Sequence, residues 1–212
     1  MMNKKTIAVY NYFNEICKGA TCTLTFDTDY SLLIAIMLSA QCTDKKVNVV
    51  TSRLFSKYHS LEDLDKLSIG EIETYLKTLG LYKNKAVYLK KIVHELLTNY
   101  NGKVPSDKSA LMSLPGVGNK TANVMLIEWF KIPAFPVDTH VNRVAKRLGF
   151  AKENDSVLTV EKNLKKSFEK NDWIDFHHKF IYFGRNFCKA INPNCNNCKL
   201  KEYCNYFKKL RK

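Results

Sequence analysis

Apolar residues recur along most of the chain at intervals of three and four, which is the spacing of one face of an α-helix. This pattern predicts a series of helices, over residues 4–16, 31–38, 44–57, 82–99, 139–148, 156–168 and 173–187. Ser60 and Ser68 each offer an N-cap to a further short helix. Strand-like alternation of apolar and polar residues is nearly absent. The sequence therefore predicts an all-α fold.

Two of the expected helices flank a turn rich in glycine. Pro115 fixes φ for a turn, and Gly116 and Gly118 permit backbone angles closed to residues with a Cβ atom. Residues 108–113 precede this turn, and a helical pattern follows it on Ala122, Met125, Leu126 and Trp129. The N–H groups that start the second helix, beside glycines that let a large group approach, indicate a phosphate site. The alternative is a hairpin that serves only as a structural corner.

Composition and charge exclude a disordered or membrane-spanning chain and favour a partner with many negative charges. The chain has 212 residues, of which 45% are hydrophobic and 12% aromatic, so it can bury a substantial core and is not disordered. Lys and Arg number 34 against 20 Asp and Glu, and the net charge of +14 favours a polyanionic partner, although an ordinary basic protein is possible. No apolar run reaches the ~20 residues of a membrane span, and the start lacks the apolar core of a signal peptide. We expect an intracellular, cytoplasmic (nucleoid-associated) protein without membrane contact.

Lys120 and Asp138 are the candidates for chemistry. Lys120 lies one residue inside the second helix, where the helix dipole disfavours a cation, and Asp138 directly precedes the helix at 139–148. An amine attacks only when neutral, and burial or a helix N-terminus favours that state. Together the two side chains suggest cleavage of an N-glycosidic bond, with a carboxylate stabilising the oxocarbenium-like sugar and an amine forming a Schiff base. The alternatives are a lysine that contacts phosphate and an aspartate that only caps its helix.

Four of the seven cysteines crowd into one segment near the C-terminus. Cys188, Cys195, Cys198 and Cys204 have the spacing C-x6-C-x2-C-x5-C. Four thiolates this close in sequence fit zinc or an iron–sulfur cluster, and disulfides are a remote alternative without a secretory signal. Structural zinc sites usually pair two CxxC units, and this segment holds one, so the residues leave the metal open.

These motifs together resemble the endonuclease III family of helix-hairpin-helix DNA glycosylases. The likeness rests on residues 114–126, on Val137-Asp138-Thr139-His140 and on the cysteine spacing, and it extends roughly from residue 32 to residue 204. It implies a six-helix barrel at residues 22–132, with the helix-hairpin-helix at about 107–130. Residues 1–21 and 133–212 would form a helical iron–sulfur domain, with DNA in a central cleft. It also implies that Lys120 is the Schiff-base nucleophile, that Asp138 activates it, and that the four cysteines hold a [4Fe–4S] cluster.

A glycosylase that acts on duplex DNA must extrude its target base and fill the space left behind. Two stretches are similar to the intercalating loops of the family, and they imply that Gln41 pairs with the orphaned base and that Leu81 acts as a wedge. The remaining DNA contacts are assigned to Gly116, Gly118, Lys83, Lys85 and His140. Asn119 departs from the family pattern, in which a basic residue is common at this place.

The favoured prediction is a monomeric, bifunctional DNA glycosylase and abasic-site lyase. Its partner would be double-stranded DNA carrying damaged bases or abasic sites, and its substrates oxidised pyrimidines. A monofunctional adenine or mismatch glycosylase is one alternative, but those relatives lack a lysine at the position of Lys120. A non-catalytic helix-hairpin-helix DNA-binding protein would leave Lys120 and Asp138 without a use. A protein that only transfers electrons through the cluster is a weaker alternative, because most of the chain would then have no function.

Overall fold

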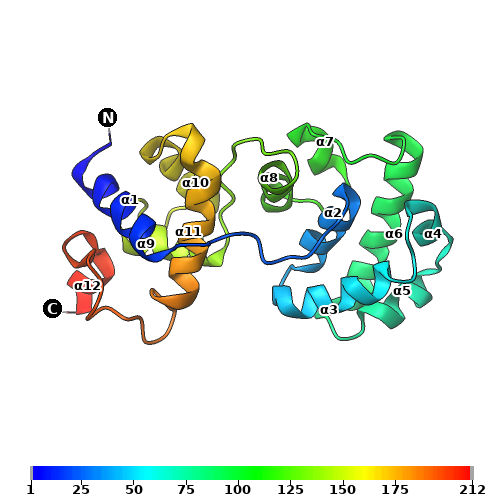
Figure 1. Cartoon of the computed structure of the whole chain (residues 1–212), viewed down its shortest axis with the longest axis horizontal. Helices are drawn as coiled ribbons and strands as arrows, with labels where there is room; N and C mark the ends of the chain where they lie inside the picture. The colour runs from blue at the N-terminus through cyan, green and yellow to red at the C-terminus, as the bar shows by residue number, and fades with distance from the viewer. Residues whose placement is uncertain (1, 211–212) are drawn as a thin grey trace. The chain divides into compact units, whose positions relative to one another are not determined.

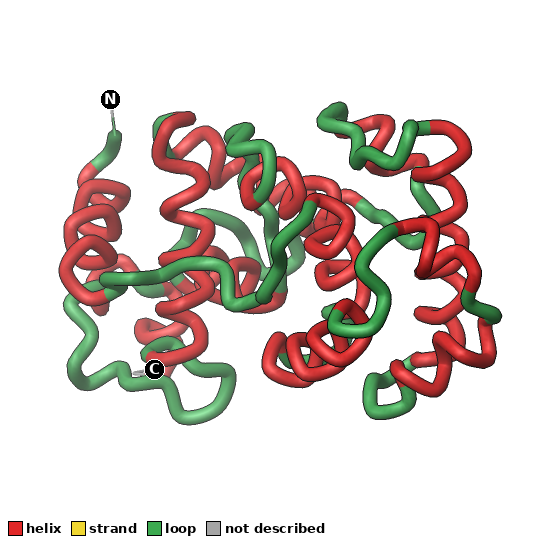
Figure 2. The backbone as a smooth tube through the Cα atoms, turned by 45° about the vertical axis from the view of Figure 1, so that its right-hand side comes forward, coloured by secondary structure: helices red, strands yellow, loops and turns green. Residues whose placement is uncertain are grey.

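The computed structural model describes residues 2–210, and every regular element in that range is a helix (Figure 2). The all-α prediction is therefore confirmed. In chain order the elements are α1 (Lys4–Ile16), α2 (Asp29–Leu38), α3 (Asp44–Phe55), α4 (Leu61–Lys66), α5 (Ile69–Leu76), α6 (Tyr82–Asn99), α7 (Lys108–Ser113), α8 (Asn119–Glu128), α9 (Thr139–Arg147), α10 (Val157–Ser167), η1 (Lys170–Asp172), α11 (Trp173–Asn186), η2 (Lys201–Tyr203) and α12 (Asn205–Leu210).

The chain divides into two compact units. Unit 1 combines Met1–Cys22 with Pro133–Lys212, and unit 2 is the continuous segment Thr23–Ile132. Unit 2 therefore holds α2 to α8, which include the glycine turn, whereas unit 1 holds α1 and α9 to α12, which include all four clustered cysteines.

Unit 1 is built around an aromatic core. Phe13 from α1 and Phe176, Phe180 and Phe183 from α11 are fully or almost fully buried. The rings of Phe13 and Phe183 lie 4.8 Å apart, within the range in which aromatic pairs add to the energy of burial. In Figure 1, α11 lies against α1 and α9, the two helices that it contacts. Because α1 supplies part of this core, the N-terminal helix belongs to the unit formed by the C-terminal part of the chain.

Unit 2 is organised around α2, which is apolar on every side and therefore has to be buried. This helix contacts α3, α6 and α8, while α4 and α5 pack on α6, as Figure 1 shows at the right-hand side of the view. Ser60 and Ser68 cap α4 and α5, as predicted: each side-chain oxygen accepts a backbone N–H in the first turn. Helix α6 therefore contacts three other helices of this unit, α2, α4 and α5.

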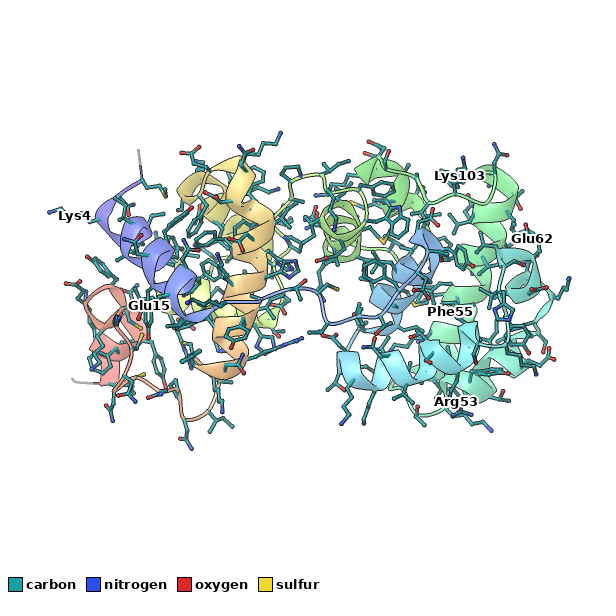
Figure 3. The ribbon with its side chains drawn as sticks, viewed as in Figure 1. Lys4, Glu15, Arg53, Phe55, Glu62 and Lys103 are labelled. Carbon is teal, nitrogen blue, oxygen red and sulfur yellow. The ribbon has the colours of Figure 1, made fainter. Side chains whose placement is uncertain are left out.

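Charged side chains cover the outside of both units. Lys4, Arg53 and Lys103, all exposed, extend away from the ribbon in Figure 3. Across the part of the chain that is described, no helix combines the length and the apolar character needed to cross a membrane.

Candidate active site and cysteine cluster

The glycine turn joins α7 to α8 as a tight hairpin. Asp107 starts α7 by accepting the N–H of Ala110 at 2.9 Å. Gly116 has φ +76°, and a Cβ atom there would stand 2.9 Å from the ring carbon Cγ of Tyr88. Both its backbone angle and its contact with Tyr88 on α6 therefore require glycine at position 116.

Gly118 differs from this expectation. It has φ −94°, a conformation open to any residue, so the prediction that it needs a glycine angle is wrong. A Cβ atom at this position would meet nothing within 4 Å. Gly118 is the N-cap of α8 and has no side chain with which to cap this helix. The backbone at Gly118 is therefore open to the approach of a ligand.

Lys120 lies in the first turn of α8, on its exposed face. Ala122, Met125 and Leu126 bury the opposite face in unit 2. Trp129, predicted on the same apolar stripe, is instead the C-cap residue and is 37% exposed. The Lys120 side chain is consequently accessible to a ligand.

Asp138 belongs to unit 1 and is the N-cap of α9. Its Oδ1 atom accepts the N–H of Val141 at 2.7 Å, so the capping role considered from the sequence is real. A capping carboxylate is held in one orientation, and its charge lies at the positive end of α9. Capping therefore fixes the orientation of the Asp138 carboxylate and is compatible with a role in stabilising a positive charge.

His140, in the first turn of α9, is half-buried. Its Nδ1 atom lies 3.3 Å from Nη2 of Arg143. Burial, reinforced by the charges of Arg143 and Arg185, lowers the pKa of His140 although Asp138 acts in the opposite direction. The lowered pKa favours the neutral imidazole, which can contact DNA through a hydrogen bond.

The two predicted intercalating residues share an unusual backbone conformation. Gln41, in the turn between α2 and α3, has φ +57°, and Leu81, the N-cap residue of α6, has φ +60°. Left-handed conformations cost residues other than glycine roughly 1–3 kcal/mol and persist only where the surroundings impose them. Both side chains are exposed, Leu81 to 55%. Sequence reasoning found the two loops but not this conformation.

The two lysines after Leu81 differ in their surroundings. Lys83 is exposed in the first turn of α6. Lys85 is only 3% exposed, and its Nζ atom donates to the carbonyl of Ala40 at 2.8 Å and lies 3.1 Å from Sγ of Cys42. The assignment of Lys85 to a DNA phosphate is therefore corrected: its ammonium is used inside unit 2.

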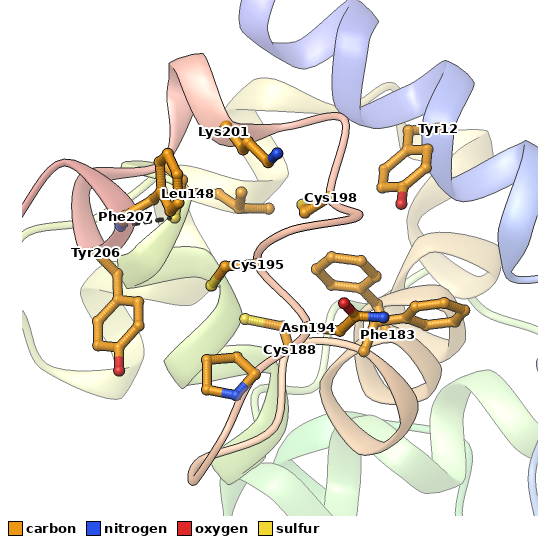
Figure 4. Close-up of a pocket in the computed structure, with 13 residues that line it drawn as sticks. Tyr12, Leu148, Phe183, Cys188, Asn194, Cys195, Cys198, Lys201, Tyr206 and Phe207 are labelled. Atoms are coloured by element: carbon orange, nitrogen blue, oxygen red, sulfur yellow. Dashed lines mark hydrogen bonds between the residues drawn. The ribbon is translucent and has the colours of Figure 1, made fainter. Parts of the chain in front are cut away.

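The four clustered cysteines line one pocket in unit 1, together with aromatic and aliphatic side chains. In Figure 4, Cys188, Cys195 and Cys198 border the same space as Tyr12 and Phe207, and Cys204 completes the set. All four are free thiols, which excludes a disulfide arrangement here. No three Cys, His, Asp or Glu side chains among residues 2–210 lie close enough together to hold a single metal ion.

Polar donors approach this pocket from α9 and α12. Arg147 donates to Sγ of Cys188 at 3.4 Å and to the carbonyl of Lys189 at 2.7 Å. The N–H of Phe207 donates to Sγ of Cys204 at 3.4 Å. Such donors stabilise thiolate sulfur.

The cysteines also affect one another. Burial raises the pKa of Cys195, and the neighbouring sulfurs of Cys188 and Cys204 raise it further. Burial is likewise the main cause of the raised pKa of Cys198. Sulfurs that oppose each other's ionisation are stabilised as thiolates by a cationic group bound among them, which fits a metal-containing occupant.

Sequence reasoning missed the arginines that join α9 to the cysteine segment. Arg143 donates to the carbonyls of Gly184 at 2.9 Å and Cys188 at 3.2 Å, and Arg147 lies one helical turn further along. Basic residues four apart on one helix face are the only local signal of this role. Helix α9 therefore carries Asp138 at its start and holds the first cysteine near its end.

Comparisons with known proteins agree over the whole chain. Residues 34–170 match the HhH-GPD superfamily base excision DNA repair protein family. Endonuclease III of Bacillus subtilis (strain 168) is 44% identical over 205 residues, covering 96% of this chain and 94% of that protein. Endonuclease III of Escherichia coli (strain K12) is 40% identical over 210 residues, covering 99% of both.

Solved structures give the same result. A trapped covalent intermediate of endonuclease III with DNA, in an estranged-adenine complex, superposes with a TM-score of 0.94 at 46% identity and full coverage of both chains. A thermostable thymine-DNA glycosylase superposes with a TM-score of 0.87 at 25% identity, covering 98% of both chains. The chain therefore belongs to the HhH-GPD superfamily of base excision DNA repair proteins and, within it, to the endonuclease III family.

Proposed function

We propose that this protein is a base-excision-repair DNA glycosylase with abasic-site lyase activity, which removes oxidised pyrimidines from duplex DNA. The observation that carries the proposal is an accessible lysine, Lys120, in the first turn of a helix whose N-cap is a glycine and which follows a glycine hairpin. That arrangement occurs in a chain 46% identical to an endonuclease III captured as a covalent intermediate with DNA.

The reaction begins at C1′ of the damaged nucleotide. The neutral amine of Lys120 forms a bond to C1′ as the bond from C1′ to the base nitrogen breaks and the base leaves with the electron pair. Asp138 stabilises the positive charge that develops on the sugar. Opening of the sugar ring gives a Schiff base between Lys120 and C1′. Loss of a proton from C2′ then expels the 3′ phosphate, and water releases the lysine.

Unit 2 holds the DNA through the protein backbone of the glycine hairpin and through the two exposed turns that carry Gln41 and Leu81. The N-terminus of α8 and the backbone at Gly118, where an added Cβ atom would meet nothing within 4 Å, suit a phosphate, and we assign Gly116 to the same contact. Gln41 and Leu81, exposed on their turns, are assigned to the space that the extruded base vacates. We assign a further phosphate to Lys83 and a hydrogen bond to His140. The enzyme acts as a monomer on damaged or abasic DNA.

The four cysteines hold a [4Fe–4S] cluster under this proposal. They line one pocket together, and their spacing resembles the cluster-binding segment of the endonuclease III family. When bound, the cluster ties the four thiolates together and fixes the segment between Cys188 and Cys204. Arg143 and Arg147 anchor that segment to α9, whose cap is Asp138.

Iron content tests the cysteine assignment. Purified protein should be coloured, absorb visible blue light and contain iron rather than zinc. Cys198→Ser should lose most of the iron and lower the melting temperature by roughly 10 °C, because binding energy in such sites is folding energy. Cys22 does not line the pocket, so Cys22→Ser should keep the iron content and the melting temperature of the wild-type protein. Colourless wild-type protein that contains zinc would contradict the assignment.

A monofunctional glycosylase is the second candidate, because the thymine-DNA glycosylase shares the fold at 25% identity. Three duplexes separate the two functions: one with thymine glycol, one with an abasic site and one with an A·G mismatch. We expect the wild-type protein to nick the first two strands and leave the third intact. Excision of adenine without strand cleavage, or no action on thymine glycol, would overturn the proposed function.

A further inference from the structure

One face of α6 carries Leu81 and contacts both the turn of Gln41 and the hairpin at Gly116. Leu81, Lys85 and Tyr88 are spaced four and three residues apart, so they lie on the same side of the helix. Leu81 is the exposed wedge at the start of α6. Tyr88 packs against the hairpin at Gly116, where an added Cβ atom would meet its ring at 2.9 Å. Lys85 reaches the turn that carries Gln41.

The contacts of Lys85 bracket Gln41. Its Nζ atom donates to the carbonyl of Ala40 at 2.8 Å and lies 3.1 Å from Sγ of Cys42, the residues on either side of Gln41. Lys85 lies one helical turn after Leu81, and its backbone N–H makes the ordinary helical hydrogen bond to the carbonyl of Leu81 at 3.1 Å. The side chain of Lys85 therefore links the turn of Gln41 to the first turn of α6, which begins at Leu81.

The ammonium group of Lys85 is buried beside the turn of Gln41, an unusual position for a charged group. An ammonium removed from water is unfavourable unless its donors find partners, and Lys85 is only 3% exposed. Gln41 and Leu81 both hold left-handed conformations, which persist only where neighbouring groups impose them. The contacts of the Lys85 Nζ atom with Ala40 and Cys42 provide such support for the turn of Gln41.

We propose that Lys85 is a positioning residue for base extrusion. It fixes the turn of Gln41 relative to Leu81, so that both side chains enter the vacated space together. This inference rests on the proposed function and concerns only its action on duplex DNA. A displacement of about 1 Å in a positioned group can cost about 10²-fold in rate, so the loss expected without Lys85 is about 10- to 100-fold.

The test compares duplex and single-stranded substrates. Lys85→Met keeps the length of the side chain and removes its donors, and Lys91→Met removes the same charge from an exposed site on α6. We would measure single-turnover excision of thymine glycol from duplex DNA and borohydride trapping on a single-stranded abasic oligonucleotide, which needs no extrusion. Lys85→Met should lose about 10- to 100-fold on the duplex and stay within about twofold on the single strand. Lys91→Met should stay within about twofold on both.

A double variant tests whether Lys85 acts through Gln41. In a Gln41→Ala background, Lys85→Met should cost less than about threefold, because the turn no longer presents the side chain that Lys85 positions. An undiminished penalty in that background, or equal losses on both substrates, would overturn the inference. If wild-type protein neither excises nor traps, the proposed function fails instead.

Folding is checked by thermal unfolding of each variant. If Lys85→Met is unfolded at the assay temperature, Lys85→Gln replaces it, because its shorter, uncharged side chain cannot keep both contacts. The same loss on the duplex and the same retention on the single strand are expected. Full duplex activity of folded Lys85→Gln would overturn the inference.

Discussion

Lys120→Met is expected to lower the rate of strand cleavage at an abasic site in duplex DNA by at least about 10³-fold, because it removes the amine that we propose as the nucleophile. The side chain is exposed and makes no contribution to the core, so the free energy of unfolding should change by less than about 0.5 kcal/mol. DNA affinity and the slope of log affinity against log salt should change little, because the mechanism uses this amine in its neutral form and assigns it to no phosphate. Single-turnover cleavage, thermal unfolding and salt titration measure the three quantities.

Lys103→Met is the matched control for this variant. Lys103 is an exposed lysine of the same unit that we assign to no contact with DNA, so its replacement removes one charge without removing a nucleophile. It should cleave at the wild-type rate. Retention of a tenth or more of the lyase activity in Lys120→Met would show that another group attacks the sugar.

Asp138→Asn is expected to reduce the excision of thymine glycol by about 10²- to 10³-fold while leaving the fold intact. Asparagine caps a helix as well as aspartate does, so the bond to the N–H of Val141 can be retained. What the variant loses is the negative charge that we propose stabilises the developing oxocarbenium ion. Excision rate and melting temperature measured together separate the chemical role from the structural one.

Asp107→Asn is the corresponding control. Asp107 caps α7 through the N–H of Ala110, in the same way that Asp138 caps α9, and it has no assigned chemical role. Equal activity losses in the two asparagine variants would mean that capping, and not charge, explains the effect of Asp138. Asp138→Ala should additionally lower the free energy of unfolding by about 1 kcal/mol, the usual value of an N-cap.

Local signals in the sequence were enough to place most helices. The pattern over 82–99 coincides with α6, and the capping residues Ser60, Ser68 and Asp138 start the helices predicted for them. Periodicity and capping are properties of adjacent residues, so they can be read before any tertiary contact is known.

Contacts between distant residues could not be predicted in this way. Lys85 is surrounded by Ala40 and Cys42, more than forty positions earlier in the chain, and only the folded unit shows that its ammonium is buried. Arg143 meets the carbonyl of Cys188 across a separation of 45 residues. The roles given to Lys120 and Asp138 came from the resemblance to a family, since neither helix position by itself distinguishes a nucleophile or an activator from ordinary surface residues.

The most direct test of the account is reductive trapping of the wild-type enzyme on a duplex that contains an abasic site, followed by mapping of the modified peptide. Borohydride reduces the Schiff base to a stable amine, so protease digestion should yield one DNA-bearing peptide, modified at Lys120. A trapped adduct on any other lysine, or no adduct from protein that binds the duplex, would contradict the assignment of Lys120 as the nucleophile.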